Sequence, residues 1–201
     1  DALFEGLCRL DPKTLKPQPG MARAWDISAD GCTYTFHLRR GARWSDGTPF
    51  IADDFLYSWR RVLHPGTASQ YAFLLHYVEG AEKFNRPNLL EPGDPVEVEP
   101  ALPPGEEPSH QGLAPEDSLL RGTLTAIERP TADQGGDAPP VYVVEIDGTP
   151  RRFRRGGGED AEDCTWILYD FGHVGVKAKD LETLVVTLKH PVPYFLDLMA
   201  F

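Results

Sequence analysis

The chain has 201 residues, of which 41% are hydrophobic and 25% are charged, and its formal net charge at pH 7 is −11. This length and balance predict a soluble, globular protein of one or two domains. No run approaches the roughly 20 apolar residues of a membrane-spanning helix, and no signal peptide is recognisable.

The first clear strand pattern runs from Thr33 to Arg39. Apolar and polar residues alternate here, which predicts a half-buried strand with Tyr34, Phe36 and Leu38 on its buried face. His37 lies on the opposite face and is interpreted as a solvated sheet residue, because no second ligand stands at metal-binding spacing.

An amphipathic helix is predicted to begin at Ala52, after the polar turn at residues 45–47. Its first turn is acidic and its last turn basic, the arrangement that the helix dipole favours. Ile51 precedes this helix and cannot cap it, a loss of about 1 kcal/mol. Trp44 and Trp59 are both expected to be buried. A second helix is predicted over residues 70–84 from the helical spacing of Tyr71, Leu74, Leu75, Val78 and Ala81.

The negative charge is concentrated between residues 86 and 175. This segment has 18 Asp and Glu against seven Lys and Arg, whereas the rest of the chain has 13 of each. It also holds 12 of the 19 prolines and 12 of the 19 glycines. The change in composition predicts an insertion with its own character.

The first part of this insertion, Arg86 to Pro115, is predicted to be extended connecting chain. The remainder is predicted to form a compact β subdomain over residues 118–172, with strands at 120–127, 141–146, 149–155 and 164–171. Asp147-Gly148 is the hairpin signal between the second and third strands. Beyond the insertion, residues 174–188 predict a strand hairpin, and the prolines at 191 and 193 precede a last short helix.

Residues 151–155, four arginines and one phenylalanine, form a basic run inside this acidic segment. We expect its arginines to face Glu145, Glu159 and Asp160, and not nucleic acid. The glycines at 156–158 precede neither a helix nor a Lys-Ser/Thr pair, so they predict a flexible loop and not a phosphate-binding site.

The three cysteines fit no zinc or redox motif. They are expected to be small packed residues, with a disulfide between Cys8 and Cys32 left open as an alternative in an oxidising compartment. No nucleophile elbow, metalloprotease motif or P-loop is present, so no catalytic residues, metal ligands or cofactors are expected and the protein is not expected to be an enzyme.

Five stretches in order carry a resemblance to a known family. Residues 39–59 have the pattern R-x-G-x-x-W-S-D-G-T-P-x-x-A-x-D-F-x-Y-S-W. The other four are LFEGL (3–7), PGMARAW (19–25), TASQYA (67–72) and VTLKHPVPYF (186–195). Together they resemble the oligopeptide- and dipeptide-binding proteins of bacterial peptide ABC transporters, solute-binding family 5. The resemblance covers about residues 3–84 and 174–201, and the stretch between has no recognised counterpart.

The resemblance implies a mixed α+β fold, part of one lobe of a type II periplasmic-binding protein. Residues 1–85 and 174–201 would form this lobe, with 86–173 inserted at one edge. The function implied is capture of peptides between two lobes outside the cytoplasm. The implied partners are the peptide and a membrane-embedded transporter permease, with no nucleic acid. The location would be periplasmic or extracytoplasmic, with a membrane anchor in the full-length protein.

Tyr71 is the one ligand-binding position that the resemblance carries over, because it matches the cleft-facing tyrosine of the TASxYA motif. The alternative is an aromatic side chain packed in the core. Two other functions stay open, namely binding of nickel, haem or an oligosaccharide on the same fold, and ligand sensing in a transcriptional regulator. The chain is expected to be a piece of a longer protein.

Overall fold

The computed structural model describes residues 5–101, 113–130 and 138–200 of the chain, which form two compact units. The sheet unit consists of Asp1–Val62, Gln70–Glu82 and Gly175–Phe201. The barrel unit consists of Leu63–Ser69 and Lys83–Val174. The barrel unit thus takes a short stretch, residues 63–69, from within the first half of the chain.

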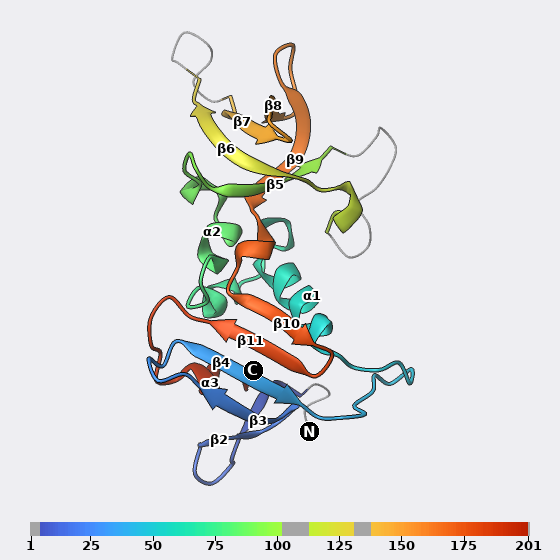
Figure 1. The fold of residues 1–201 in the computed structure, drawn as a ribbon, viewed down its shortest axis with the longest axis vertical. Coiled ribbons are helices and arrows are strands. Elements are labelled where there is room, and N and C mark those ends of the chain that lie inside the picture. Colours follow the sequence, from blue (N-terminus) through green and yellow to red (C-terminus); the bar gives the residue numbers. More distant parts are fainter. Residues whose placement is uncertain (1–4, 102–112, 131–137, 201) are drawn as a thin grey trace. The chain divides into compact units, whose positions relative to one another are not determined.

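A four-stranded antiparallel sheet organises the sheet unit, with its strands in the order β10-β11-β4-β3 (Figure 1). Its strands are β3 (Ala22–Ile27), β4 (Thr33–Leu38), β10 (Val176–Asp180) and β11 (Thr183–Thr187). Two shorter strands, β1 (Cys8–Leu10) and β2 (Pro17–Pro19), pair separately. The predicted strand at 33–39 and the predicted hairpin at 174–188 are both confirmed.

The alternation in β4 produces the core of this unit. Tyr34, Phe36 and Leu38 are all buried, as predicted. Phe195, in the short helix α3 (Phe195–Leu198), is fully buried and its ring centroid lies 4.8 Å from that of Tyr34. Aromatic and branched side chains on one face of the sheet therefore pack against the last helix.

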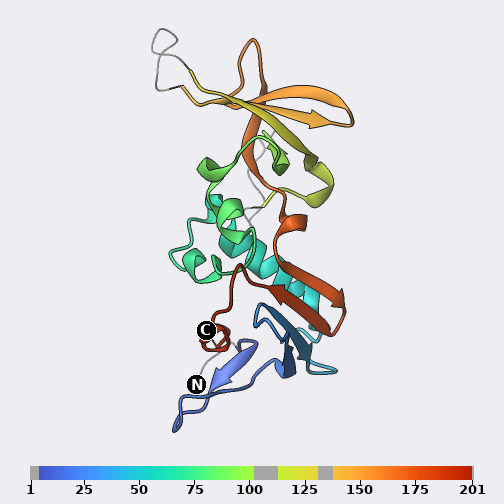
Figure 2. The same cartoon turned by 60° about the vertical axis from the view of Figure 1, so that its left-hand side comes forward.

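Helix α1 (Ala52–Leu63) has the predicted acidic first turn and basic last turn. It lies beside the β10–β11 hairpin in both views (Figures 1 and 2). The backbone N–H of Ala52 donates to the carbonyl of Leu181 at 2.9 Å, and Asp54 Oδ2 accepts from the N–H of Ile51 at 2.8 Å. These two bonds compensate for the missing side-chain cap at Ile51.

The prediction that both tryptophans are buried is wrong. Trp44 is 44% exposed: its ring packs against Phe50 and its Nε1 donates to Asp54 Oδ2 at 3.2 Å, so part of the ring faces solvent. Trp59 is only half-buried. The helical pattern located α1 correctly but did not indicate how deeply each aromatic side chain would be buried.

The predicted helix over residues 70–84 is also wrong. The stretch contains a 3-10 turn, η2 (Ala72–Leu75), and the beginning of a short helix, α2 (Ala81–Asn85). Between them, Val78 forms a β-bridge with Leu188, and the N–H of Glu79 donates to the carbonyl of Thr187. Pairing with a strand that is distant in sequence takes the backbone groups that a helix would use.

A closed five-stranded barrel forms most of the barrel unit (Figure 1). Its strands are β5 (Pro95–Pro100), β6 (Leu120–Glu128), β7 (Val141–Ile146), β8 (Thr149–Arg155) and β9 (Glu162–Tyr169), each paired with the next and β9 with β5. All pairs are antiparallel except β8–β9. Closure leaves no unpaired sheet edge. The interior is filled by Leu90, Val96, Val98, Leu124, Val144, Phe153, Cys164 and Ile167.

The β7–β8 hairpin has the predicted bounds, with Asp147 at φ 50° and Gly148 at φ 73° in its two-residue turn. The expectation that residues 86–115 are connecting chain is wrong, because β5 lies in this stretch and pairs with both β6 and β9 in the barrel. Residues 102–112 of the same stretch lie outside the described residues.

The described part of the barrel unit also contains short 3-10 segments. They are η1 (Pro65–Thr67), η3 (Pro87–Leu89), η4 (Glu116–Ser118) and η6 (Phe171–His173).

Cys8, Cys32 and Cys164 are free, so the alternative disulfide between Cys8 and Cys32 is not formed. No described helix is both long and apolar enough to span a membrane.

Candidate functional site

Tyr71 lies in the sheet unit, immediately before η2, and its carbonyl accepts the N–H of Leu74 at 3.0 Å. The residue is 69% exposed, so its ring is not part of the core. Ala72 and Leu75 are the buried residues of this turn. The 3-10 geometry therefore turns Tyr71 outward, whereas a regular helix would have placed it on the apolar face with Leu75.

A second exposed aromatic side chain, Phe73, follows two residues later and is 56% exposed. It lies just outside the motif TASQYA, which ends at Ala72. A signal was available, because Phe73 falls outside the apolar spacing that was assigned to this stretch. Tyr71 and Phe73 thus present much of two aromatic side chains to solvent from one short stretch. Such groups can form hydrogen bonds and stacking contacts with a ligand.

The chain that follows η2 is held by a cluster of aromatic residues. The Tyr194 hydroxyl donates to the Tyr77 hydroxyl at 2.9 Å, and this hydrogen bond raises the pKa of Tyr194. The ring of Tyr77 also meets that of His190 edge-on, with the centroids 6.3 Å apart. The N–H of Lys189 donates to the carbonyl of Tyr77 at 2.9 Å. These contacts attach the segment that follows η2 to the residues that precede α3.

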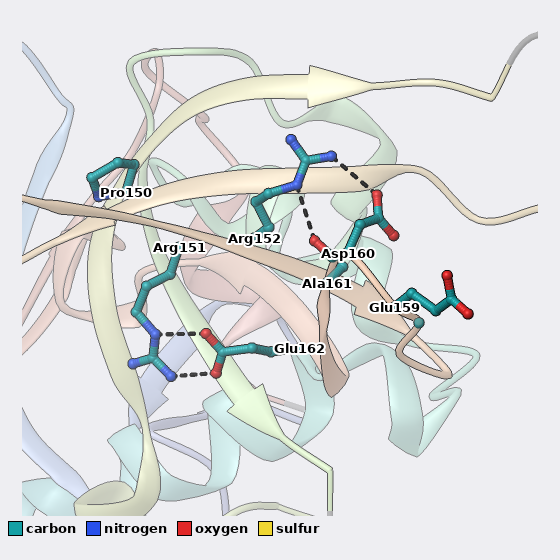
Figure 3. A pocket seen from close by; sticks show the side chains of 8 residues that line it. Pro150, Arg151, Arg152, Glu159, Asp160, Ala161 and Glu162 are labelled. Carbon is teal, nitrogen blue, oxygen red and sulfur yellow. Dashed lines mark hydrogen bonds and ion pairs between the residues drawn. The ribbon is translucent and has the colours of Figure 1, made fainter.

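A separate hollow of about 460 Å³ lies on the barrel unit, along β8 and the start of β9 (Figure 3). It is lined by Pro150, Arg151, Arg152, Gly158, Glu159, Asp160, Ala161 and Glu162. Five of these eight residues are charged, unlike the mostly apolar clefts that bury small ligands.

The arginines of this hollow are paired with acids of the same unit. Arg151 forms a two-pronged ion pair with Glu162, one contact of which spans 2.8 Å (Figure 3). Arg152 forms another with Glu128, at 2.9 and 2.7 Å, and also reaches Asp160 at 3.2 Å. The hydrogen bonds from Arg151 lower the pKa of Glu162. Because the charges compensate one another, we assign the hollow to the stability of the barrel and not to ligand capture.

The prediction of acidic partners for the basic run was right in kind and partly wrong in identity. Asp160 is a partner of both Arg152 and Arg154, as predicted. The other partners are Glu162 and Glu128, in place of the expected Glu145 and Glu159. Spacing along the chain could not give these pairs, because they depend on the parallel β8–β9 pairing and on the β6–β7–β8 register.

The side chains that could bind a metal ion are those of His, Cys, Asp and Glu. Within residues 5–101, 113–130 and 138–200, no group of three or more His, Cys, Asp and Glu side chains is arranged to hold a metal ion. His37, the histidine considered in the sequence, contacts Asp26 at 2.8 Å across β3 and β4.

Comparison with known protein families gives a match over most of the chain. The model of the bacterial extracellular solute-binding proteins, family 5 Middle, matches residues 16–201. The matched range begins before β3 and encloses the whole barrel unit.

Individual relatives agree with this match. A dipeptide-binding protein of Bacillus subtilis, DppE, is 45% identical over 173 residues, which are 86% of this chain and 26% of that protein. The periplasmic oligopeptide-binding protein OppA of Escherichia coli is 53% identical over 75 residues, 37% of this chain and 13% of that protein. These named relatives are binding proteins.

Among solved structures, the substrate-binding domain of an oligopeptide ABC transporter from Bacillus anthracis is similar with a TM-score of 0.54 and 29% identity. The similarity covers 98% of this chain and 23% of that one. The fold is therefore that of part of a type II periplasmic-binding protein, as expected. The chain spans about a quarter of the length of these relatives, or less.

Proposed function

Because the chain belongs to the bacterial extracellular solute-binding proteins of family 5, we propose that it is part of the peptide-capturing component of an ABC transporter. The ligands would be dipeptides or oligopeptides, bound outside the cytoplasm. Relatives named for both kinds of ligand support this proposal. Capture would be by non-covalent binding, without catalysis.

The observation that carries the proposal is the exposure of Tyr71 in the stretch TASQYA. An exposed phenol can donate a hydrogen bond to a peptide carbonyl or accept one from a peptide N–H, groups that every peptide has. Such a bond contributes about 1 kcal/mol, whereas a micromolar complex requires about 8 kcal/mol. Most of the affinity would come from other walls of the binding cleft, including parts of the longer protein outside this chain.

The partner in transport would be a membrane-embedded permease, and the location periplasmic or extracytoplasmic, with an anchor to the membrane. We also propose that residues 86–173 are an insertion at the edge of the solute-binding lobe. The acidic composition of this segment and its barrel, which closes on itself, support that reading.

The proposal is tested by calorimetric titration of di- to pentapeptides into the natural full-length protein that carries this chain. We expect Tyr71→Phe to weaken peptide binding about fivefold, the equivalent of one hydrogen bond of about 1 kcal/mol. Tyr71→Ala should weaken it further, because the ring contact is lost as well. Neither change should lower the melting midpoint, since the side chain is 69% exposed.

Tyr57→Phe is the matched control, because Tyr57 is a second exposed tyrosine of the sheet unit, on α1. This variant should bind peptides with unchanged affinity. Equal affinity in the Tyr71 variants and the natural protein would remove Tyr71 from the site. Failure of every peptide to bind, with binding of nickel, haem or an oligosaccharide, would replace the proposed ligand class.

A further inference from the structure

His64 is a buried histidine of the barrel unit, located where α1 ends and the chain towards Tyr71 begins. Its side chain is 1% exposed, and its Nε2 lies 3.1 Å from Oε1 of Glu99, a residue of β5 that is 3% exposed. Its Nδ1 accepts the backbone N–H of Gly66 at 3.1 Å. Because that N–H can only donate, Nδ1 has no proton, and the proton on Nε2 is donated to the carboxylate.

The ring of His64 is enclosed by aromatic side chains of the same unit. It meets Trp166 edge-on at a centroid distance of 5.8 Å and Phe84 at 6.3 Å. Trp166 and Glu99 are register partners on β9 and β5. His64 is therefore docked on two neighbouring barrel strands, with both ring nitrogens hydrogen-bonded and two aromatic rings beside it.

The loop that follows has little burial of its own. Gly66, Thr67 and Ala68 are exposed, and the 3-10 turn η1 is closed by short-range bonds such as Thr67 N–H to the carbonyl of His64 at 3.0 Å. The buried ring of His64 thus anchors the start of this loop on the barrel. Gln70 is the first residue of the sheet unit after this loop, and Tyr71 follows it.

We propose that His64, held by Glu99, is a positioning residue for the ligand contact made by Tyr71, an inference that rests on the proposed function. The docked ring restricts the backbone that leads into the ligand-binding turn before the peptide arrives. A site that is ordered in advance loses less conformational entropy on binding. Without the anchor, only a fraction of the molecules hold Tyr71 ready, and the apparent affinity falls by that fraction.

Three substitutions separate the two hydrogen bonds of the ring. In His64→Asn, the side-chain carbonyl can still cap Gly66, but the shorter side chain no longer reaches Glu99. In His64→Gln, the amide N–H₂ occupies the place of Nε2 and can still donate to Glu99. Gly66→Ala disturbs the anchor from the exposed side, because its Cβ would lie 3.0 Å from the His64 ring and 3.4 Å from Trp166 Nε1.

Glu97→Gln is the matched control for the loss of a buried polar contact. Glu97 is fully buried on the same strand, and its Oε2 accepts the N–H of Phe171, a residue outside the His64 loop, at 3.3 Å. Its substitution should lower the melting midpoint of the protein without weakening peptide binding.

The experiment measures peptide affinity by calorimetry, the melting midpoint, and hydrogen exchange of residues 67–72 in the natural full-length protein. We expect His64→Asn and Gly66→Ala to weaken peptide binding about tenfold, as for a binding-competent fraction of about one in ten, and to speed exchange at 67–72. His64→Gln should restore most of the affinity. Glu97→Gln should change the midpoint alone.

Unchanged peptide affinity in both His64→Asn and Gly66→Ala would overturn the positioning role, while a loss in Tyr71→Ala would leave the proposed function standing. Weakening by Glu97→Gln equal to that by His64→Asn would show a general effect of stability and would also overturn it. If Tyr71→Ala binds peptides normally, the proposed ligand contact fails, and the positioning role fails with it.

Discussion

Of the nine large hydrophobic side chains that are exposed in the described residues, eight belong to the sheet unit, and one, Leu89, belongs to the barrel unit. Buried polar and charged side chains show the opposite distribution. Four of the five in the described chain lie in the barrel unit, namely His64, Glu97, Glu99 and Asp170, and only Arg60 lies in the sheet unit.

The difference separates a unit that buries paired polar groups from one that leaves apolar side chains in solvent. The strands of the barrel pair in a closed ring, and Arg151, Arg152 and Arg154 form ion pairs with acids of the same unit. The sheet unit leaves aromatic side chains such as Tyr71 and Phe73 in solvent. Exposed aromatic side chains are able to form stacking contacts and, for tyrosine, hydrogen bonds with a ligand.

The largest expected effect comes from emptying either core. Phe36 is fully buried in the sheet unit and Phe153 is 2% exposed in the barrel. Replacing either by Ala should cost about 3–5 kcal/mol of unfolding free energy, through lost burial and a residual cavity. If the units are energetically separate, each substitution should loosen its own unit.

Cysteine labelling shows which of the two units each substitution opens. Burial raises the pKa of the thiols of Cys8, in the sheet unit, and Cys164, in the barrel, to about 12 in each case. Both should therefore react with an alkylating reagent only when their own unit opens. Phe153→Ala should speed labelling of Cys164 and Phe36→Ala that of Cys8. Equal acceleration of both thiols by one substitution would show that the units unfold together.

A smaller effect is expected from the capping carboxylate of the sheet unit. Asp54→Ala removes the acceptor of both the Ile51 N–H and the Trp44 Nε1–H, and should cost about 1 kcal/mol, the usual value for a helix cap. Asp53→Ala is the control, since Asp53 also lies in the first turn of α1 and is exposed. Urea unfolding of the two variants is the measurement. A loss for Asp53→Ala as large as for Asp54→Ala would assign the effect to the helix dipole and not to the cap.

The smallest effect concerns the surface ion pairs of the barrel. The pKa of Glu162 is lowered by the hydrogen bonds from Arg151, so the folded state favours the ionised carboxylate more than the unfolded state does. The stabilisation is present above the unfolded pKa of about 4.3 and is lost as the pH falls through the lower folded value. Glu162→Gln should therefore make the barrel less sensitive to acid between about pH 5 and pH 3, as followed by urea unfolding.

Arg151→Gln should remove the same pH dependence, and the double variant should lose no more than either single one. Additive effects of the two substitutions would mean that the pair is not the cause. The change should be modest, because exposed ion pairs contribute little.

Elements with strong local patterns could be predicted from the sequence. The alternation at 33–38, the acidic and basic ends of α1 and the Asp147-Gly148 turn each depend on residues that are neighbours along the chain. The family could also be identified from short motifs. In these cases side-chain spacing and turn chemistry decide the local backbone.

The candidate site could be predicted only in part. The sequence motif identified Tyr71, whereas the exposure of Tyr71 and Phe73 depends on the 3-10 turn that replaces the expected helix. His64 gave no signal in the sequence, because its partner Glu99 lies in a stretch whose composition predicts connecting chain.

The composition of residues 86–115 predicts solvated chain, because isolated acidic residues are costly to bury. Only the tertiary structure supplies the partners that make burial favourable. The ring of His64 reaches Glu99, and the N–H of Phe171 reaches Glu97, while Val96 and Val98 on the other face of β5 fill the barrel. The sequence by itself thus determined the elements whose partners are local. The strand β5, the split of residues 70–84 and the buried histidine depend on groups that are distant in the chain and that meet only in the folded protein.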